Sequence, residues 1–324
     1  MYLLSHFRER NFMRIKHLLL LLAVLPLLAI LLLYSSSGSI VEITPSDEEW
    51  IMVGAYVDDS WFQEIYGVNT KDPQQLVLDA APIGNEPDWS PDGQWVAYDN
   101  FGFVKGLSAI YLEKNDRARK IKVADGYAPV WSPNGNQIAY KFRDDIYLLN
   151  VECFIESRFC DLNPSFVTTG NNPSWSPDGD KIVFEREYDI YTINMVTFES
   201  VEVFAPLDGG CRKPDWSITN KILMACWGEY QGLYVINSDG TDITKFDNGD
   251  LGWESPKWSP SGEKIAFVDY LTISSVEGST SVVYVMDSNG DNLIRLTEHD
   301  NYSIAWFTWI PPFTKPEICT VFCK

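Results

Sequence analysis

The feature that most constrains the fold of this chain is a short motif that recurs at a nearly constant interval. The motif is Pro-x-Trp-Ser, usually continued as Pro, a small polar residue and Gly, and its tryptophans are Trp89, Trp131, Trp175, Trp216 and Trp258. They lie 42, 44, 41 and 42 residues apart. Such a period is typical of repeat proteins, whose units bury their apolar faces against neighbouring units. We expect these tryptophans to pack between units, and we assign Trp306, 48 residues further on, to a degenerate sixth copy.

Each repeat carries the signals of four β-strands. Ser, Pro, a small polar residue and Gly in succession are typical of a type I turn, because Pro sets φ at the second position. An apolar run follows the turn, and after it comes an aliphatic-Tyr pair. There are six such pairs: Ile65-Tyr66, Ile110-Tyr111, Ile146-Tyr147, Ile190-Tyr191, Leu233-Tyr234 and Val283-Tyr284. A fourth strand is clearest at residues 293–297. Four strands per repeat predict a propeller blade, and we find no helical periodicity that would indicate an α/β fold.

The first blade has an aliphatic-Tyr pair but no tryptophan strand of its own. It begins near Trp50, and we expect residues 304–308 at the far end of the chain to supply its innermost strand. This closure would remove two open sheet edges. The sequence therefore predicts an all-β fold: a six-bladed β-propeller of four-stranded antiparallel blades over residues 49–313, followed by a tail over residues 314–324.

The repeats resemble those of the TolB-type propeller family, whose units are WD40-like PD40 repeats. The resemblance rests on the Pro-x-Trp-Ser stretches, the aliphatic-Tyr pairs and the final Arg295-Leu296-Thr297, and it covers about 265 residues. It implies a propeller in the bacterial periplasm, or an equivalent outer compartment, that binds proteins through its loops and channel mouth. TolB carries an α/β domain before its propeller, and prolyl-oligopeptidase-like peptidases carry a hydrolase domain after theirs. We expect neither here.

A targeting element precedes the repeats. Residues 18–34 form a run of 17 apolar residues that includes Pro26. Basic residues precede the run at Arg8, Arg10, Arg14 and Lys16, and no Lys or Arg follows it until Lys71. This asymmetry predicts a single-pass signal anchor, with residues 1–17 in the cytoplasm and a linker, residues 35–48, leading to a propeller on the periplasmic or cell-surface side. The alternative is a cleaved signal peptide, because small residues follow the run at residues 35–39.

Charge and residue types exclude several classes of function. The net charge is −20, and the residues after Tyr34 carry −23, so the propeller repels nucleic acid and anionic lipid surfaces. Only three histidines occur, and there is no G-x-S-x-G, H-E-x-x-H or Walker sequence. We expect no catalytic residues, metal or cofactor. Two alternatives stay open: a carboxylate pair acting as a glycosidase or polysaccharide lyase, and Ca²⁺ bound near Asp239-Gly240 or in the Asp-rich loops.

Strand parity divides the loops between two faces of the predicted ring. We call bottom the face that holds the first-to-second and third-to-fourth turns of each blade, and top the face that holds the second-to-third loops and the connections between blades. The top loops are longer and more varied, which suits recognition. We expect the top face to bind a protein or an envelope polymer, although each aromatic side chain could instead pack against its own blade. The candidate binding residues are Asp59, Trp61, Phe62, Arg143, Asp144, Asp145, Tyr188, Asp189, Tyr230 and Trp253.

All six cysteines follow the apolar run, and an even number in an oxidising compartment suggests disulfides. Cys211 and Cys226 lie symmetrically about the turn at residues 217–220, so we expect them to face each other in a hairpin and to form a bond. Cys153 with Cys160, and Cys319 with Cys323, are the other expected pairs. The alternatives are free buried thiols or a metal site, although the spacings match no zinc pattern.

Overall fold

A computed structural model of the chain describes residues 49–57, 63–71, 76–79, 84–100, 108–115, 118–156, 163–246, 254–271, 280–297 and 302–311. These residues all belong to one compact unit, Glu48–Lys324. The predicted anchor, its linker and the tail at residues 314–324 lie outside the described residues. Among the helices described, none has the length and apolar character needed to span a membrane.

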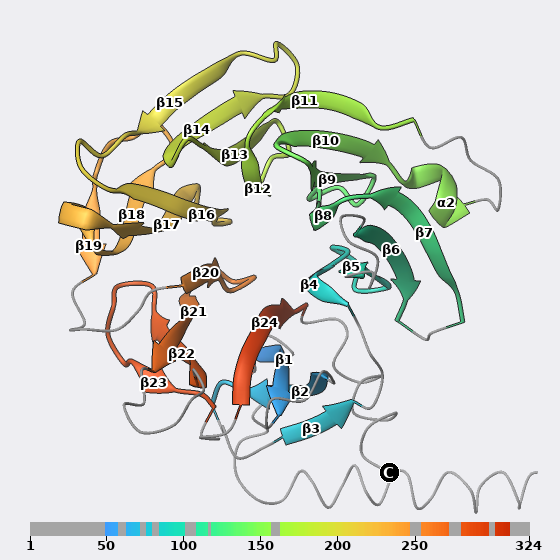
Figure 1. The fold of residues 1–324 in the computed structure, drawn as a ribbon, viewed down its shortest axis with the longest axis horizontal. Helices are drawn as coiled ribbons and strands as arrows, with labels where there is room; N and C mark the ends of the chain where they lie inside the picture. Colours follow the sequence, from blue (N-terminus) through green and yellow to red (C-terminus); the bar gives the residue numbers. More distant parts are fainter. Residues whose placement is uncertain are drawn as a thin grey trace, which may run out of the picture. The chain divides into compact units, whose positions relative to one another are not determined.

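The described residues form six four-stranded antiparallel sheets around a central axis, as predicted (Figure 1). From the axis outward, blade 1 contains β24 (Tyr302–Ile310), β1 (Trp50–Val57), β2 (Gln63–Asn69) and β3 (Leu76–Asp79). Blade 2 contains β4 (Asn85–Trp89), β5 (Trp95–Asn100), β6 (Ala109–Lys114) and β7 (Lys120–Asp125). Blade 3 contains β8 (Tyr127–Trp131), β9 (Gln137–Phe142), β10 (Asp145–Asn150) and β11 (Ser165–Thr169).

The remaining blades follow the same order. Blade 4 contains β12 (Asn171–Trp175), β13 (Lys181–Arg186), β14 (Asp189–Asn194) and β15 (Ser200–Phe204). Blade 5 contains β16 (Gly210–Trp216), β17 (Lys221–Trp227), β18 (Gly232–Asn237) and β19 (Thr244–Phe246). Blade 6 contains β20 (Glu254–Trp258), β21 (Lys264–Leu271), β22 (Thr280–Asp287) and β23 (Ile294–Arg295). The six aliphatic-Tyr pairs lie on the third strand of their blades, as the repeat pattern predicts.

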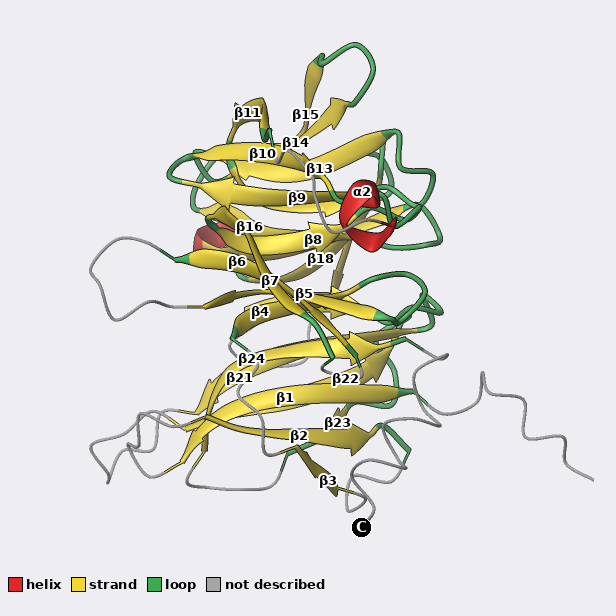
Figure 2. Cartoon of the chain, turned by 90° about the vertical axis from the view of Figure 1, so that its right-hand side faces the viewer, coloured by secondary structure: helices red, strands yellow, loops and turns green. Residues whose placement is uncertain are grey.

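The ring closes between the two ends of the propeller. β24 pairs antiparallel with β1 from Trp50 opposite Ile310 to Val57 opposite Tyr302. The predicted closing segment, residues 304–308, lies within β24, so the expected closure is confirmed. Because Trp50 and Ile310 lie opposite each other, both ends of the propeller emerge on the bottom face. In Figure 2 this face is on the right, where the short helix α2 (Glu152–Glu156) follows β10.

The sixth tryptophan position differs from the sequence assignment. In five blades the repeat tryptophan faces the second residue of the second strand: Val96, Ile138, Ile182, Ile222 and Ile265. In blade 1 the residue that faces the equivalent Ile51 is Trp309, not Trp306. The indole N–H of Trp309 donates to the carbonyl of Lys257 in the preceding blade (3.4 Å), as that of Trp175 does to Val130 (3.3 Å).

Trp306 is also buried, but it has a different role. Its indole lies over Gly54, where an added Cβ would come within 2.3 Å of the ring. A glycine at that position therefore makes room for the tryptophan.

The core lies between the blades. Trp131 of blade 3 packs against side chains of blade 2, among them Trp95, Ala97, Ile110 and Leu112. Trp258 of blade 6 packs in the same way against Leu223, Leu233, Val235 and Phe246 of blade 5. The five repeat tryptophans keep only 6–8% of their surface exposed. Burial of such large side chains between neighbouring sheets is a major source of the stability of a ring.

Candidate functional site

The innermost strands share a backbone irregularity that shapes the channel. The residue before each repeat proline has a left-handed conformation, with φ between 46° and 49° at Glu86, Ala128, Asn172, Lys213 and Ser255. The strand register shifts at the same place in each of these blades. A β-bulge of this kind redirects a side chain. All five residues line a cavity of about 100 Å³ in the upper channel.

An ion pair crosses this upper cavity. Lys213 Nζ lies 3.4 Å from Glu86 Oε1 and donates a hydrogen bond to Ser255 Oγ (2.9 Å). Glu86 belongs to blade 2 and Lys213 to blade 5, which face each other across the ring (Figure 1). The contact therefore bridges the channel on its top side. The side chains are 39% and 35% exposed, so water weakens their attraction.

Below this bridge, side chains from the middle of the Pro-x-Trp motifs link the blades. Asp88 Oδ2 accepts a hydrogen bond from the backbone N–H of Trp131 (2.7 Å), which joins blades 2 and 3. Asp215 Oδ2 accepts one from the N–H of Trp258 (2.7 Å), which joins blades 5 and 6. Ser174 Oγ accepts one from the N–H of Trp216 (3.0 Å), which joins blades 4 and 5. These side chains satisfy backbone groups that would otherwise be unpaired at a blade boundary.

Both carboxyl groups hold their protons more tightly than usual. Burial raises the pKa of Asp88 to about 6; Asp215 raises it further, while Lys257 and the Trp131 N–H oppose the shift. Burial also raises the pKa of Asp215, again opposed by Lys257. Asp88, Asp215 and Lys257 all line a larger cavity of about 340 Å³, which is open on the bottom side. Asp88 and Asp215 therefore link neighbouring blades through their hydrogen bonds.

The raised pKa of Asp88 gives a testable pH dependence. The pKa of Asp88 in the folded protein lies above the usual value of 3.8, so folding favours the protonated carboxyl group. Its contribution to the free energy of unfolding is complete below pH 3.8 and is lost as the pH rises through about 6. A shift of this size corresponds to about 3 kcal/mol, and water in the channel should reduce it to about 1–2 kcal/mol. We expect Asp88→Asn, which keeps an acceptor for Trp131, to remove this part of the decline. Denaturant unfolding at a series of pH values measures the free energy of unfolding of both proteins. If the wild type and the variant lost stability in parallel as the pH rose, Asp88 would not be the group responsible.

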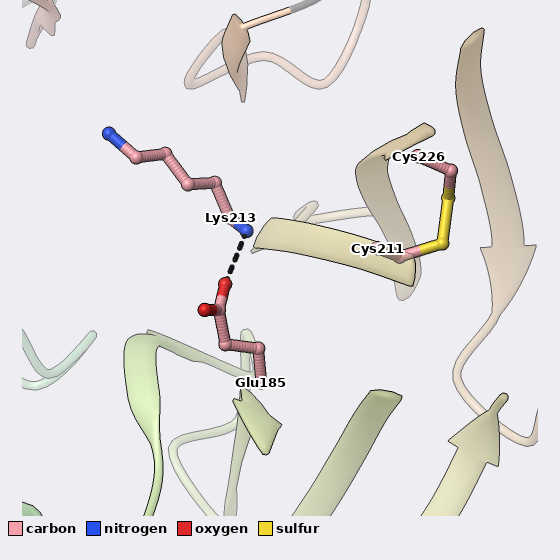
Figure 3. Close-up of a disulfide and its surroundings, with 4 residues drawn as sticks. All are labelled: Glu185, Cys211, Lys213 and Cys226. Atoms are coloured by element: carbon pink, nitrogen blue, oxygen red, sulfur yellow. Dashed lines mark hydrogen bonds between the residues drawn. A yellow bond between two sulfur atoms is a disulfide. The ribbon is translucent and has the colours of Figure 1, made fainter. Parts of the chain in front are cut away.

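A second pair of acids was not anticipated from the sequence. Burial, chiefly, raises the pKa of Asp99 to about 7, and Asp99 accepts hydrogen bonds from Ser108 Oγ (3.1 Å) and the N–H of Ala128 (3.4 Å). Glu185 accepts from the N–H of Lys213 (3.0 Å) and from Asn172 Nδ2 (2.8 Å), and Figure 3 shows the first of these bonds. Both acids lie near the end of the second strand of their blade, and each accepts a hydrogen bond from the bulged residue of the next blade. An acid at this strand position is therefore the sequence signal from which the pair could have been predicted.

The structure places six of the ten predicted binding residues. Arg143 and Asp144 are exposed in the turn between β9 and β10, and Asp145 begins β10, where it accepts a hydrogen bond from Thr169 Oγ1 (2.9 Å). Asp189 begins β14. Tyr188 is 57% exposed, whereas Tyr230 is half-buried and packs against neighbouring aromatic rings. These residues form separate groups on blade 3 and on blades 4 and 5. The remaining four, Asp59, Trp61, Phe62 and Trp253, lie outside the described residues.

The predicted Cys211–Cys226 disulfide is confirmed (Figure 3). The two residues lie directly opposite each other on β16 and β17, with their Cα atoms 4.1 Å apart. They lie at the top end of the hairpin, and Cys211 is two residues from Lys213. Cys153 falls on α2, but its side chain is outside the described residues, as are Cys160, Cys319 and Cys323.

The suggested calcium sites have no counterpart in the part of the chain that the structure describes. There, no three His, Cys, Asp or Glu side chains are grouped to hold a metal. Asp239 Oδ1 instead accepts hydrogen bonds from the N–H (3.0 Å) and the hydroxyl (2.6 Å) of Thr241, which lower its pKa. These bonds are typical of a hairpin turn.

The fold and its ring closure define a six-bladed β-propeller, and TolB proteins are among the solved structures that share this fold. TolB from Acinetobacter baumannii superimposes with a TM-score of 0.63 and 16% identity, over 81% of this chain and 66% of that one. A putative TolB from Agrobacterium tumefaciens superimposes with a TM-score of 0.56 and 18% identity, over 81% of this chain and 99% of that one. A chain of a nidogen/laminin complex superimposes with a TM-score of 0.60 and 9% identity, over 81% of this chain and 98% of that one. At these identities the similarity concerns the fold alone. No protein-family model matches the sequence, and no curated protein matches it.

Proposed function

We propose that this chain is a non-catalytic β-propeller, anchored in the cell membrane by residues 18–34, that binds a protein or envelope polymer through its top face outside the cytoplasm. The main support is that the top loops present exposed aromatic and charged side chains, while the channel carboxyl groups of Asp88 and Asp215 accept hydrogen bonds that link blades. The shared fold with TolB proteins agrees with a binding role.

The channel supports binding at the surface better than glycoside cleavage inside it. A propeller glycosidase or lyase would need two carboxyl groups free to reach the substrate. Asp88 and Asp215 each hold a backbone N–H of the next blade instead. The upper cavity, of about 100 Å³, is bridged by Lys213 and Glu86, which leaves little room for a sugar ring from the top.

The orientation follows from where the chain enters the ring. β1 begins and β24 ends on the bottom face, and the linker of residues 35–48 can extend at most roughly 45–50 Å. We therefore expect the bottom to face the membrane and the top to face outward. Antibodies against top-loop epitopes should bind intact cells. Shielding of the top loops with the bottom turns accessible would contradict this orientation.

The binding role is tested by crosslinking the full-length protein in envelope extract and comparing variants. We expect Trp61→Ala together with Arg143→Ala to reduce capture of a specific partner, and Val196→Ser, an exposed change on the bottom face, to leave it intact. Capture that depends on the bottom residue, or release of reducing sugars from envelope polysaccharide by the purified protein, would refute the proposed function.

A further inference from the structure

Three top-face loops of blades 4 and 5 pack into one continuous surface. They are the turn between β13 and β14, the connection between β15 and β16, and the loop after β17, which includes the 3-10 helix η2 (Gly228–Tyr230). The Tyr188 ring lies edge-on to Trp227, with centroids 5.0 Å apart. An added Cβ on Gly209 would lie 2.0 Å from the carbonyl oxygen of Trp227, and one on Gly210 would lie 2.6 Å from Tyr188 Cβ. Only glycine allows the loops to approach this closely.

This surface exposes apolar and aromatic side chains together. Leu207 is 96% exposed on the connection between β15 and β16, Tyr188 is 57% exposed, and Trp227 is half-buried against the Tyr188 ring. The Arg212 guanidinium lies 5.4 Å from the Trp227 ring centroid. Single exposed apolar residues are common on protein surfaces, but Tyr, Trp and Arg side by side are typical of the residues that dominate interface energies.

The surface is held rigid. Glu187 and Tyr188 are the two central residues of the hairpin turn between β13 and β14, and their left-handed φ values of 52° and 74° fit a type I′ turn, whose twist matches that of the flanking strands. The backbone carbonyl of Tyr188 accepts a hydrogen bond from the N–H of Cys211 (2.8 Å). Arg212 and Trp227 each adjoin one half of the disulfide, and Arg212 is ion-paired with Glu254 of blade 6. A preorganised surface loses little conformational entropy on binding.

Exposed acids lie on the same three loops as these side chains. Glu187, Asp208 and Glu229 are exposed on the three loops, and the nearby Arg212 is already paired with Glu254. The residues after Tyr34 carry a net charge of −23. Acids that share these loops with exposed apolar side chains, on a chain of this net charge, attract a basic partner and repel nucleic acid and anionic lipid.

We propose that the blade 4–5 patch binds a Lys- or Arg-rich segment of a protein partner that places an apolar side chain against Tyr188 and Leu207. The patch comprises Glu187, Tyr188, Leu207, Asp208, Trp227 and Glu229. This inference rests on the proposed top-face binding function and names its centre and the chemistry of its partner. The basic groups of the segment contact the acids of the patch, and the apolar side chain contacts Tyr188 and Leu207.

The test uses full-length protein in non-ionic detergent and three fluorescein-labelled peptides of equal length. One carries several lysines and a central leucine in a Gly/Ser background, one has glutamate for lysine, and one has serine for leucine. Fluorescence anisotropy should show the tightest binding for the first peptide. Tyr188→Ala and Leu207→Ser should each weaken it about tenfold or more, the range of an interface hot spot, whereas the control Val196→Ser should leave it unchanged.

Equal affinity for the acidic peptide, or basic-peptide binding that survives both patch substitutions, would overturn the patch. Because Leu207 is almost fully exposed, Leu207→Ser should fold normally, and its melting temperature verifies this. The same variants in the crosslinking experiment separate the two proposals. Partner capture that is lost only with Trp61→Ala and Arg143→Ala refutes the patch but leaves top-face binding in place. Capture that no top-face substitution reduces refutes the function itself.

Discussion

Replacing Trp309 by alanine should lower the free energy of unfolding by about 3–5 kcal/mol, the usual cost of removing a buried tryptophan. Trp309 is 6% exposed and packs in the core cluster that joins blade 1 to blade 6. Its indole N–H also donates to the carbonyl of Lys257. The substitution would therefore leave a cavity at the boundary between blades 1 and 6, beside the strand pair that closes the ring. Denaturant unfolding followed by far-ultraviolet circular dichroism measures the change.

A matched control is available on the surface. Phe198 is also aromatic but is 53% exposed in the turn before β15, so Phe198→Ala should cost less than about 1 kcal/mol. If Trp309→Ala proved no more destabilising than Phe198→Ala, the seam would not depend on this residue. A large change in the slope of unfolding against denaturant would show instead that the ring opens before it unfolds.

The sequence predicted the blades well because the repeat chemistry is local. Proline and glycine in the turns and the aliphatic-Tyr pairs act within a few residues, so their spacing identified the strands without knowledge of the ring. The register of the closing strand, in contrast, depends on its pairing with β1 at the other end of the propeller. β24 has a bulge opposite Gly54 and Ala55, and its motif lacks the usual proline before the tryptophan. Trp309-Ile310-Pro311 does keep the Trp-x-Pro spacing of the other copies, which could have identified Trp309.

The functional residues divide along the same lines. The Cys211–Cys226 bond was predictable because both residues belong to one hairpin. Lys213 and Glu86 are 127 residues apart and meet only because the ring places blades 2 and 5 opposite each other. The blade 4–5 patch likewise depends on three loops from two blades. Tyr188 was identified as an exposed aromatic in a top loop, but nothing in the sequence indicated that Leu207 and Trp227 would join it.

Removing the disulfide with Cys211→Ala and Cys226→Ala together should lower the free energy of unfolding by about 3 kcal/mol. The bond closes a loop with a sequence separation of 15, and in the chain-entropy model a loop of this length restricts the unfolded chain by about that amount. Thermal unfolding with and without a reducing agent measures the effect. Because Cys211 is fully buried and Cys226 is 6% exposed, reduction of the folded protein should be slow.

The double variant also tests the remaining cysteines, because any effect of a reducing agent on it must come from bonds other than Cys211–Cys226. If Cys211–Cys226 is the bond that matters, a reducing agent should destabilise the wild-type protein and leave the variant unchanged. A further loss in the reduced variant would report the predicted Cys153–Cys160 or Cys319–Cys323 bonds. Wild-type stability that reduction does not alter after full unfolding and refolding would contradict the prediction. Because the bond adjoins Arg212 and Trp227, its removal should also loosen the blade 4–5 patch and weaken binding of the basic peptide more than Val196→Ser does.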